Sequence, residues 1–215
     1  MGHVTDDDRE ITVLAFSERY GAAVDKLLGI EGGHVNDKLD RGGETNLGIS
    51  LRFLKAEGAI DLDRDGFADF DLDMDGDIDG ADIRKLTKGD ARFLYHRCFW
   101  QRLEAETFPR PIGEMMFDQA VNGGLLAARK LLQRAVNAIG RKYRYRGIGL
   151  KVDGAIGDKT RGQLSMLIER HGTQEIVAAY REAAKERYQA IVRASPSQAR
   201  FLKGWLRRVD ELGRA

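Results

Sequence analysis

Apolar residues recur at intervals of three and four along most of the chain, which is the spacing of one face of an α-helix. The first such stripe runs toward Ile30 through Val13, Phe16, Tyr20, Val24 and Leu27. Further helices are predicted over residues 51–57, 88–104, 112–122, 125–139, 159–170, 174–194 and 198–212. The segment 33–50 is instead rich in Gly, Asn and Asp, which indicates loops or a short hairpin. The pattern therefore predicts a mostly α fold with one small non-helical region.

The stripe of the first helix meets a glutamate, Glu31, at a position where the pattern calls for an apolar residue. Gly32 and Gly33 follow, and glycine is common where a helix ends in a left-handed residue. Burial and the negative end of the helix dipole both disfavour a carboxylate, so they would raise the pKa of Glu31. A carboxyl group that keeps its proton near neutral pH can act as the general acid in glycoside cleavage. The alternative is a glutamate that turns toward water at a frayed helix end.

Two aspartates and a threonine follow Glu31 within the glycine-rich stretch: Asp37, Asp40 and Thr45. Either aspartate could supply a second carboxylate, and Thr45 supplies a hydroxyl. Glycosidases pair two carboxyl groups, of which one protonates the leaving oxygen and the other orients a water or stabilises the oxocarbenium centre. The order of an acid, an aspartate nine residues later and then a threonine is close to that of phage-type lysozymes. The sequence leaves open which aspartate points inward, and whether the reaction is inverting or retaining.

Residues 31–50 read EGGHVNDKLDRGGETNLGIS. This segment resembles the signature EGGYVNDPxDxGGxTNxGIT of glycoside hydrolase family 108, the N-acetylmuramidases. Later elements of that family resemble this chain in the same order, at residues 97–100, 117–124, 152–160 and 201–208. The matches cover most of the chain outside an aspartate-rich tract at 61–82.

The resemblance implies a lysozyme-like helical fold that cleaves the β-1,4 bond between N-acetylmuramic acid and N-acetylglucosamine, with Glu31 as the catalytic acid. It favours Asp40 over Asp37 as the second carboxylate. Thr45 is the candidate for binding a water or a substrate hydroxyl. His34 stands where the family has the tyrosine that would stack on a sugar. The candidates for substrate binding are Asn36, Asn46, Asp118 and Asn122, although Asn122 before two glycines also fits a helix cap.

The family comparison divides the chain into a catalytic region at 1–108, which includes the 61–82 insertion, and a helical peptidoglycan-binding region at 109–215. We expect the two to pack as one globule.

Charge is unevenly distributed along the chain, with the acidic residues concentrated in the 61–82 insertion. The formal net charge is +1, but ten aspartates and one arginine lie between residues 61 and 82, which gives that stretch −9 and leaves +10 on the rest. A body that basic suits an anionic polymer, unless the charge is only a solvated surface. No nucleic-acid-binding motif accompanies the charge, so we expect no nucleic-acid partner.

The second half of the tract has the spacing of an EF-hand calcium loop. Acids occupy loop positions one, three, five, seven, nine and twelve, with glycine at six: Asp71, Asp73, Asp75, Asp77, Asp79 and Asp82. Hard oxygen ligands suit Ca²⁺, and the glycine permits the sharp turn. An aspartate at position twelve makes the loop resemble that of dockerin modules. We predict a structural Ca²⁺ site and no organic cofactor; the alternative is a disordered acidic loop.

A half-loop of the same kind precedes it, with acids at Asp61, Asp63, Asp65 and Asp69. Position twelve of this half-loop is Leu72, so it either borrows Asp71 to hold a second ion or binds none. Clustered carboxylates repel one another, so cation binding should be coupled to ordering of the insertion.

Several features bear on where the protein works. A single cysteine, Cys98, allows no internal disulfide and suits synthesis in a reducing compartment. The N-terminus is acidic where a signal peptide would be basic, and no stretch of about 18 apolar residues occurs. We therefore expect synthesis in the cytoplasm, no stable membrane insertion, and action on the cell wall in the periplasm or outside the cell. A holin lesion or a secretion route would supply access.

The first hypothesis is a monomeric phage or prophage endolysin that hydrolyses peptidoglycan glycan strands. A lytic transglycosylase would cut the same bond with one acid/base glutamate and leave an anhydro sugar. A non-catalytic wall-binding or dockerin-like module is the alternative from another class.

Overall fold

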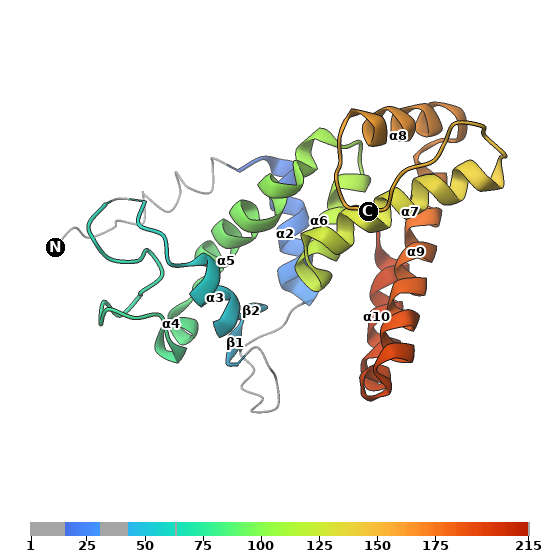
Figure 1. The fold of residues 1–215 in the computed structure, drawn as a ribbon. Helices are drawn as coiled ribbons and strands as arrows, with labels where there is room; N and C mark the ends of the chain where they lie inside the picture. The colour runs from blue at the N-terminus through green and yellow to red at the C-terminus, as the bar shows by residue number, and fades with distance from the viewer. Residues whose placement is uncertain (1–15, 31–42, 63, 215) are drawn as a thin grey trace. The chain divides into compact units, whose positions relative to one another are not determined.

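The computed structural model describes residues 16–30, 43–62 and 64–214. Within these residues helices dominate, and the β structure is one two-stranded hairpin (Figure 1). The predicted mostly α, lysozyme-like fold class is confirmed. Among the described residues, no helix is both long enough and apolar enough to cross a bilayer. The chain forms two compact units, Met1–Trp100 and Gln101–Ala215, which are called unit 1 and unit 2 below.

Unit 1 carries short helices around the hairpin. In chain order its elements are α2 (Glu18–Ile30), β1 (Thr45–Asn46), β2 (Ile49–Ser50), α3 (Leu51–Glu57), α4 (Gly80–Lys85) and α5 (Lys88–Tyr95), and a π-helical turn η1 (His96–Gln101) continues α5. Helices α2 and α3 and the hairpin lie where the sequence predicts them. The helix predicted over 88–104 is α5 with η1, and its last residue, Glu104, has instead a left-handed backbone with a φ of 54°.

The stripe of α2 forms part of the core of unit 1. Tyr20, Val24 and Leu27 are all buried. The Tyr20 ring contacts Phe16 edge-on at a centroid distance of 5.2 Å and lies 5.3 Å from the Trp100 ring. The Tyr20 hydroxyl donates a hydrogen bond to the Arg92 carbonyl, so its polar end is satisfied inside the core. Burial along this face confirms the periodicity up to Leu27.

Helix α4 was not predicted. Asp79 caps its N-terminus by accepting from the Ala81 N–H at 2.5 Å, and the Asp82 carboxylate accepts from the Asp79 N–H at 2.6 Å. This reciprocal pair is a capping box, which needs an acid three residues after the cap. The sequence does contain the Asp-x-x-Asp spacing of such a box. The same two aspartates, however, also occupy positions nine and twelve of the predicted calcium loop.

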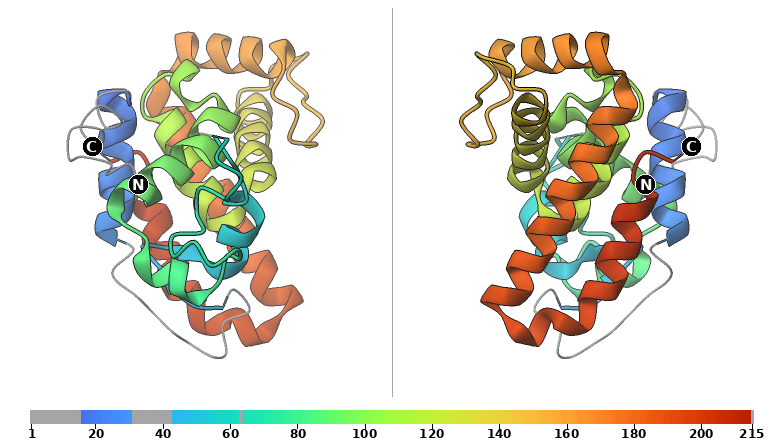
Figure 2. Two further views of the ribbon diagram at one scale, coloured as in Figure 1. Left: turned by 90° about the vertical axis from the view of Figure 1, so that its left-hand side faces the viewer. Right: turned by 90° about the vertical axis from the view of Figure 1, so that its right-hand side faces the viewer.

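Unit 2 is entirely helical in its regular structure. Its elements are η2 (Ala105–Thr107), α6 (Ile112–Gly123), α7 (Leu125–Lys142), α8 (Asp158–His171), α9 (Thr173–Ala194), η3 (Pro196–Gln198) and α10 (Ala199–Glu211). Helix α9 packs against α7, and with α10 it forms a hairpin closed by η3 (Figure 2). Four of the predicted helices match within one residue at each end. Helix α7 runs three residues past its predicted end at 139.

One face of α7 builds the core of unit 2 and also holds the loop that follows it. Asn137 donates to the Leu150 carbonyl at 2.8 Å and accepts from the Leu150 N–H at 2.7 Å. Gln133, which is buried, donates to Asp153 Oδ1 and to the Ala155 carbonyl and accepts from the Gly154 N–H. The loop's backbone groups are therefore paired by side chains of the preceding helix.

Candidate functional site

Five of the predicted site residues lie outside the described part of the chain: Glu31, Asn36, Asp37, Asp40 and Asp63. Helix α2 ends at Ile30, one residue before Glu31. Val24 and Leu27 are 0 and 2% exposed. Positions 24, 27 and 31 have the spacing of one helical face, so the buried stripe leads toward the predicted acid.

Thr45 and Asn46 form the first strand of the hairpin, which turns through Leu47 and Gly48. Both turn residues have positive φ, 52° and 76°. Two consecutive residues of this kind form the type I′ turn that suits a two-residue hairpin. The register pairs Thr45 with Ser50 and Asn46 with Ile49.

The two candidate residues of β1 point to opposite faces of the hairpin, because side chains alternate along a strand. Asn46 shares a face with the buried Ile49, and its Nδ2 donates to the Ile83 carbonyl at 2.9 Å and to the Leu86 carbonyl at 3.4 Å. Asn46 thus ties the hairpin to α4. Thr45 lies on the other face and is partly exposed, so it is the residue of β1 that is placed to meet water or a ligand.

Two further contacts hold the hairpin. Arg84 Nη1 donates to both carboxylate oxygens of Glu44, at 3.1 and 2.9 Å. The Tyr95 hydroxyl donates to the Leu47 carbonyl at 2.9 Å. Helix α4, which begins within the last residues of the aspartate tract, is therefore bonded to the hairpin by side chains on both sides. No sequence pattern predicts this link, because it joins residues about 40 positions apart.

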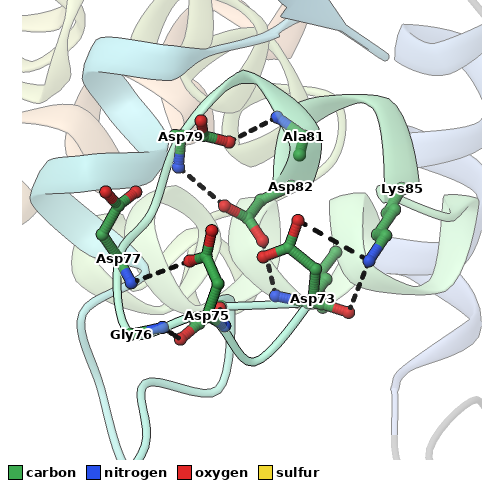
Figure 3. A network of polar contacts seen from close by, with 10 residues as sticks. Asp73, Asp75, Gly76, Asp77, Asp79, Ala81, Asp82 and Lys85 are labelled. Carbon is green, nitrogen blue, oxygen red and sulfur yellow. Dashed lines mark hydrogen bonds and ion pairs between the residues drawn. The ribbon is translucent and has the colours of Figure 1, made fainter.

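The loop of residues 71–82 folds around two buried carboxylates (Figure 3). Asp71 and Asp82 are 6 and 0% exposed. Asp71 accepts from the Asp75 N–H at 3.2 Å and from the Gly76 N–H at 2.9 Å. Asp82 accepts from the N–H groups of Leu72 and Asp79, each at 2.6 Å. The loop backbone thus directs its N–H groups at the first and last acids of the predicted calcium loop.

A third carboxylate, Asp73, faces the same centre. Oxygens of Asp71, Asp73 and Asp82 lie within 4.8 Å of one another, and among the described residues this is the group of acids and histidines close enough to share an ion. Ligands on a single Ca²⁺ lie about 2.3–2.6 Å from it, so two opposite oxygens are about 5 Å apart. The three carboxylates fit that ion. Figure 3 shows the Asp77 carboxylate directed away, as expected at position seven, where the backbone carbonyl is the ligand.

The negative charge of this centre is poorly balanced by the protein. The buried Oδ1 of Asp73 has no hydrogen-bond partner, while its Oδ2 lies 3.7 Å from the half-exposed Lys85 Nζ. Desolvation, followed by the neighbouring Asp75, raises the pKa of Asp73 above its usual value. Buried carboxylates are stable when they are paired or bound to a metal, so these groups suit a cation.

The first half-loop repeats the backbone of the second. Asp61 accepts from the N–H groups of Asp65 and Gly66, each at 3.1 Å, as Asp71 does from the corresponding residues. The fourth positions, Arg64 and Met74, both have left-handed φ, at 62° and 60°. Asp69 accepts from the Leu62 N–H at 3.1 Å, in the place that Asp82 takes in the second loop. Asp61 and Asp65 are exposed and Asp69 is half-buried, so the described acids of this half-loop are less buried than Asp71 and Asp82.

The two candidate residues of α6 have partners inside unit 2. Asp118 accepts from Arg208 Nε at 3.1 Å to each oxygen, and both side chains are largely buried. Asn122, which is exposed, donates to the Asp118 carbonyl at 2.8 Å. Asp118 thus joins α6 to α10, a structural contact beside the substrate-binding role predicted for it.

The helices and the single hairpin of the described residues are those of a mostly α, lysozyme-like fold. Residues 24–124 match the family described as Glycosyl hydrolase 108, and residues 127–210 match the family described as Predicted Peptidoglycan domain. The two matches support a glycosyl hydrolase 108 domain followed by a peptidoglycan domain, and with them a glycoside hydrolase that acts on peptidoglycan. The predicted boundary at 108/109 falls between the end of unit 1 and the end of the first domain.

The solved structure of Brucella abortus SagA is similar to this chain. The two are 25% identical, the match covers 90% of each chain, and the TM-score is 0.64. No curated protein matches the sequence.

Proposed function

We propose that the chain is an N-acetylmuramidase that hydrolyses the β-1,4 bond between N-acetylmuramic acid and N-acetylglucosamine, with Glu31 as general acid. The glycosyl hydrolase 108 match carries the proposal, because it spans Glu31, the hairpin and α6. The buried stripe of α2 and the peptidoglycan domain at 127–210 support it.

In this mechanism the protonated Glu31 donates to the glycosidic oxygen as the bond breaks. In the sequence Glu31 directly follows the last residue of α2, and the negative end of a helix dipole favours the protonated form that a general acid needs. Asp40, or Asp37, orients a water or stabilises the oxocarbenium centre. Thr45, on the hairpin face away from α4, holds that water or a substrate hydroxyl.

A Glu31→Gln variant tests the acid. The expected result is a loss of about 100-fold or more in the rate at which purified sacculi are solubilised, because the variant has no proton to give. Glu18→Gln is the matched control, since Glu18 is an exposed glutamate in the first turn of the same helix. Sedimentation with sacculi should be unchanged in both variants. Solubilisation by Glu31→Gln at the wild-type rate would refute the proposal and favour a wall-binding module.

Product masses separate hydrolysis from transglycosylation. A muramidase leaves a reducing N-acetylmuramic acid end, whereas a lytic transglycosylase leaves an anhydro end that is lighter by one water. We further propose that the protein works in the periplasm or outside the cell as a monomeric phage or prophage endolysin. Lysis of a bacterial host that depends on a co-expressed holin would support this role, and lysis without one would favour a secretion route.

We also propose that residues 71–82 bind one structural Ca²⁺. The two buried carboxylates and the convergent third one favour it. Asp71, Asp73 and Asp82 would hold the ion, with Asp75 and the backbone of Asp77 as further ligands and Asp79 as the helix cap. The ion would balance the negative charge of these carboxylates. Because Asp82 lies in the first turn of α4, the ion would also fix the N-terminus of this helix, and α4 in turn bonds to the hairpin through the Ile83 carbonyl and Arg84.

Titration calorimetry with CaCl₂ tests this site in the full chain. We expect one ion per chain, and no binding after Asp82→Asn. Asp61→Asn separates the two loops: unchanged stoichiometry assigns the ion to residues 71–82, and loss of a second ion assigns one to the half-loop as well. Wild-type protein that takes up no Ca²⁺ would refute the proposal without touching the muramidase assay.

A further inference from the structure

Helix α7 ends in an exposed, strongly basic turn. Between residues 141 and 151 the chain has five basic residues and no acidic one. The C-terminus of α8 meets this turn through ring contacts. We define the basic cap as the residues at these two helix ends: Arg141, Lys142, Tyr143, Arg144, Tyr145, Arg146, Arg170 and His171.

The backbone of the cap is a Schellman motif. The Tyr145 N–H donates to the Gly140 carbonyl at 2.9 Å, and the Arg144 N–H donates to the Arg141 carbonyl at 3.2 Å. This pair of bonds places Arg144 at the first residue beyond the helix cap, where the left-handed conformation is required. Arg144 accordingly has a φ of 54°.

Arginine is an unfavourable choice at such a position. Glycine is the usual residue there, because a Cβ atom crowds the backbone in the left-handed region. Folding alone would thus favour glycine at 144, and the Arg144 side chain is exposed. Residues that hold a strained backbone tend to cluster at functional sites. Other non-glycine residues of the described chain also have left-handed φ; at Arg144 this backbone coincides with an exposed guanidinium in a basic turn, which a ligand outside the protein would explain.

The rings of the cap are already arranged. Tyr143 and His171 stack with centroids 3.9 Å apart, and the Tyr145 hydroxyl lies 2.9 Å from His171 Nε2. The Arg170 guanidinium lies 5.2 Å from the centroid of the Tyr145 ring. Tyr143 is 40% exposed. The cap therefore presents an aromatic surface held by these ring contacts and bordered by positive charge.

The charges of the cap do not depend on a ligand for folding. Helices α7 and α8 both end there, and the negative end of a helix dipole favours basic residues. Lys142 pairs with Glu175 at 2.6 Å, and this hydrogen bond raises the pKa of Lys142. Arg141, Arg144 and Arg146 are exposed, so they can meet an anionic partner.

We propose that the basic cap binds the free carboxylates of peptidoglycan stem peptides. Arginine pairs with carboxylates through two parallel hydrogen bonds, and an exposed tyrosine face gives the strand an apolar contact. The cap lies within the peptidoglycan domain at 127–210, and its charge complements those carboxylates. The inference rests on peptidoglycan as the substrate class but not on Glu31 as the acid.

The test uses the full chain in the Glu31→Gln background, so that sacculi stay intact during binding. Arg144→Gly should weaken sedimentation with purified sacculi by about 3–10-fold, because one charged contact is lost. The same change should raise Tm by about 2–4 °C, because glycine relieves the left-handed backbone. Arg144→Lys keeps the charge and the strain, so its Tm should stay near that of the parent and its affinity should fall less.

Arg200→Gln is the matched control, since Arg200 is an exposed arginine that packs on an aromatic ring of α10. It removes the same charge and should leave binding within about twofold. Glycan strands stripped of stem peptides by an amidase should bind the parent protein more weakly than intact sacculi. The inference is overturned if stripped strands bind equally well, if Arg144→Gly binds like the parent or no worse than Arg200→Gln, or if a DNA duplex or phosphatidylglycerol vesicles bind more tightly than sacculi. If instead Glu31→Gln proves fully active, only the catalytic proposal fails.

Discussion

The loop of residues 71–82 and the basic cap are both clusters of like charge, but they are stabilised in different ways. In the loop, Asp71 and Asp82 are buried and face a third carboxylate. In the cap, the arginines at 141, 144 and 146 are exposed at the end of a long helix. The first cluster removes charge from water, and the second leaves it in water.

The same contrast appears between single aspartates. Desolvation and neighbouring carboxylates raise the pKa of Asp73. Hydrogen bonds from Gln133 and from the Ala155 N–H lower the pKa of the exposed Asp153. A carboxylate is therefore stable beside amide donors and unstable beside other carboxylates. The acidic loop thus holds like charges together away from water, the arrangement on which the calcium proposal rests, whereas the arginines of the basic cap remain in water.

Of the changes considered, calcium should have the largest effect on stability, and this effect should be confined to the acidic loop. At a free Ca²⁺ concentration of about 100 times Kd, binding to the folded chain alone adds about 2.7 kcal/mol of stability. For a chain of this size that gives a Tm rise of roughly 5–10 °C relative to chelator. Calorimetry with hydrogen exchange should show the added protection at residues 71–82 and not at the basic cap. Equal melts in calcium and in chelator would show that the acidic loop is stable without an ion.

The effect of Asp82→Asn on the free energy of unfolding should depend on whether calcium is bound. In calcium, the substitution should remove most of the stabilisation, because it deletes a ligand charge. In chelator, the variant should be as stable as the wild type or up to about 1–2 kcal/mol more stable, because it removes one of the clustered charges. Urea unfolding under both conditions measures this, with Asp210→Asn in unit 2 as the control. The same loss under both conditions would mean that Asp82 acts only as a partner for the Leu72 and Asp79 N–H groups.

Asn46→Ala tests how the acidic loop reaches the hairpin. It removes the hydrogen bonds to the Ile83 and Leu86 carbonyls and should cost about 1–2 kcal/mol of stability. If Asn46 positions the hairpin, any increase of kcat by calcium should shrink while KM changes little. A rise in KM alone would instead support its predicted contact with substrate. Gln174→Ala is the control, because Gln174 is an exposed amide side chain in unit 2 and is not a site candidate.

The smallest effect is expected at Asp153. Because its pKa is lowered in the folded chain, its hydrogen bonds add stability above the ordinary aspartate pKa, and this stability is lost as pH falls through the lower folded value. Asp153→Asn should therefore lower Tm slightly at neutral pH and have no effect in strong acid. Melts across this pH range measure the difference. A pH-independent difference would assign the effect to geometry and not to charge.

Much of the helical fold could be predicted, because apolar spacing reports the face that is buried. Val24 and Leu27 are buried as their positions require, and α9 lies within one residue of its predicted range. Helix α4 was missed because it is only six residues long and has too few apolar positions to show a period. The end of α7 was misplaced because Arg141 and Lys142 are as common in a helix's last turn as in a basic loop.

Site residues were predictable by type and only partly by place. The aspartate spacing predicts a calcium loop over residues 71–82, and in the structure the first and last of its acids, Asp71 and Asp82, are buried. The spacing could not show that backbone N–H groups of the loop are directed at Asp71 and Asp82, because that depends on the path of the backbone. It also could not show that Asn46 and Thr45 are divided between two faces, one of which α4 covers.

By itself, the sequence determined the helical periods, the acidic and basic segments and the resemblance to a muramidase, because these are properties of order along the chain. Only the tertiary structure decided that α4 bonds to the hairpin, that Asp71, Asp73 and Asp82 converge, and that Arg144 holds a left-handed turn beside His171. Those outcomes depend on which distant backbone groups come within hydrogen-bonding distance, and spacing along the chain does not specify that distance.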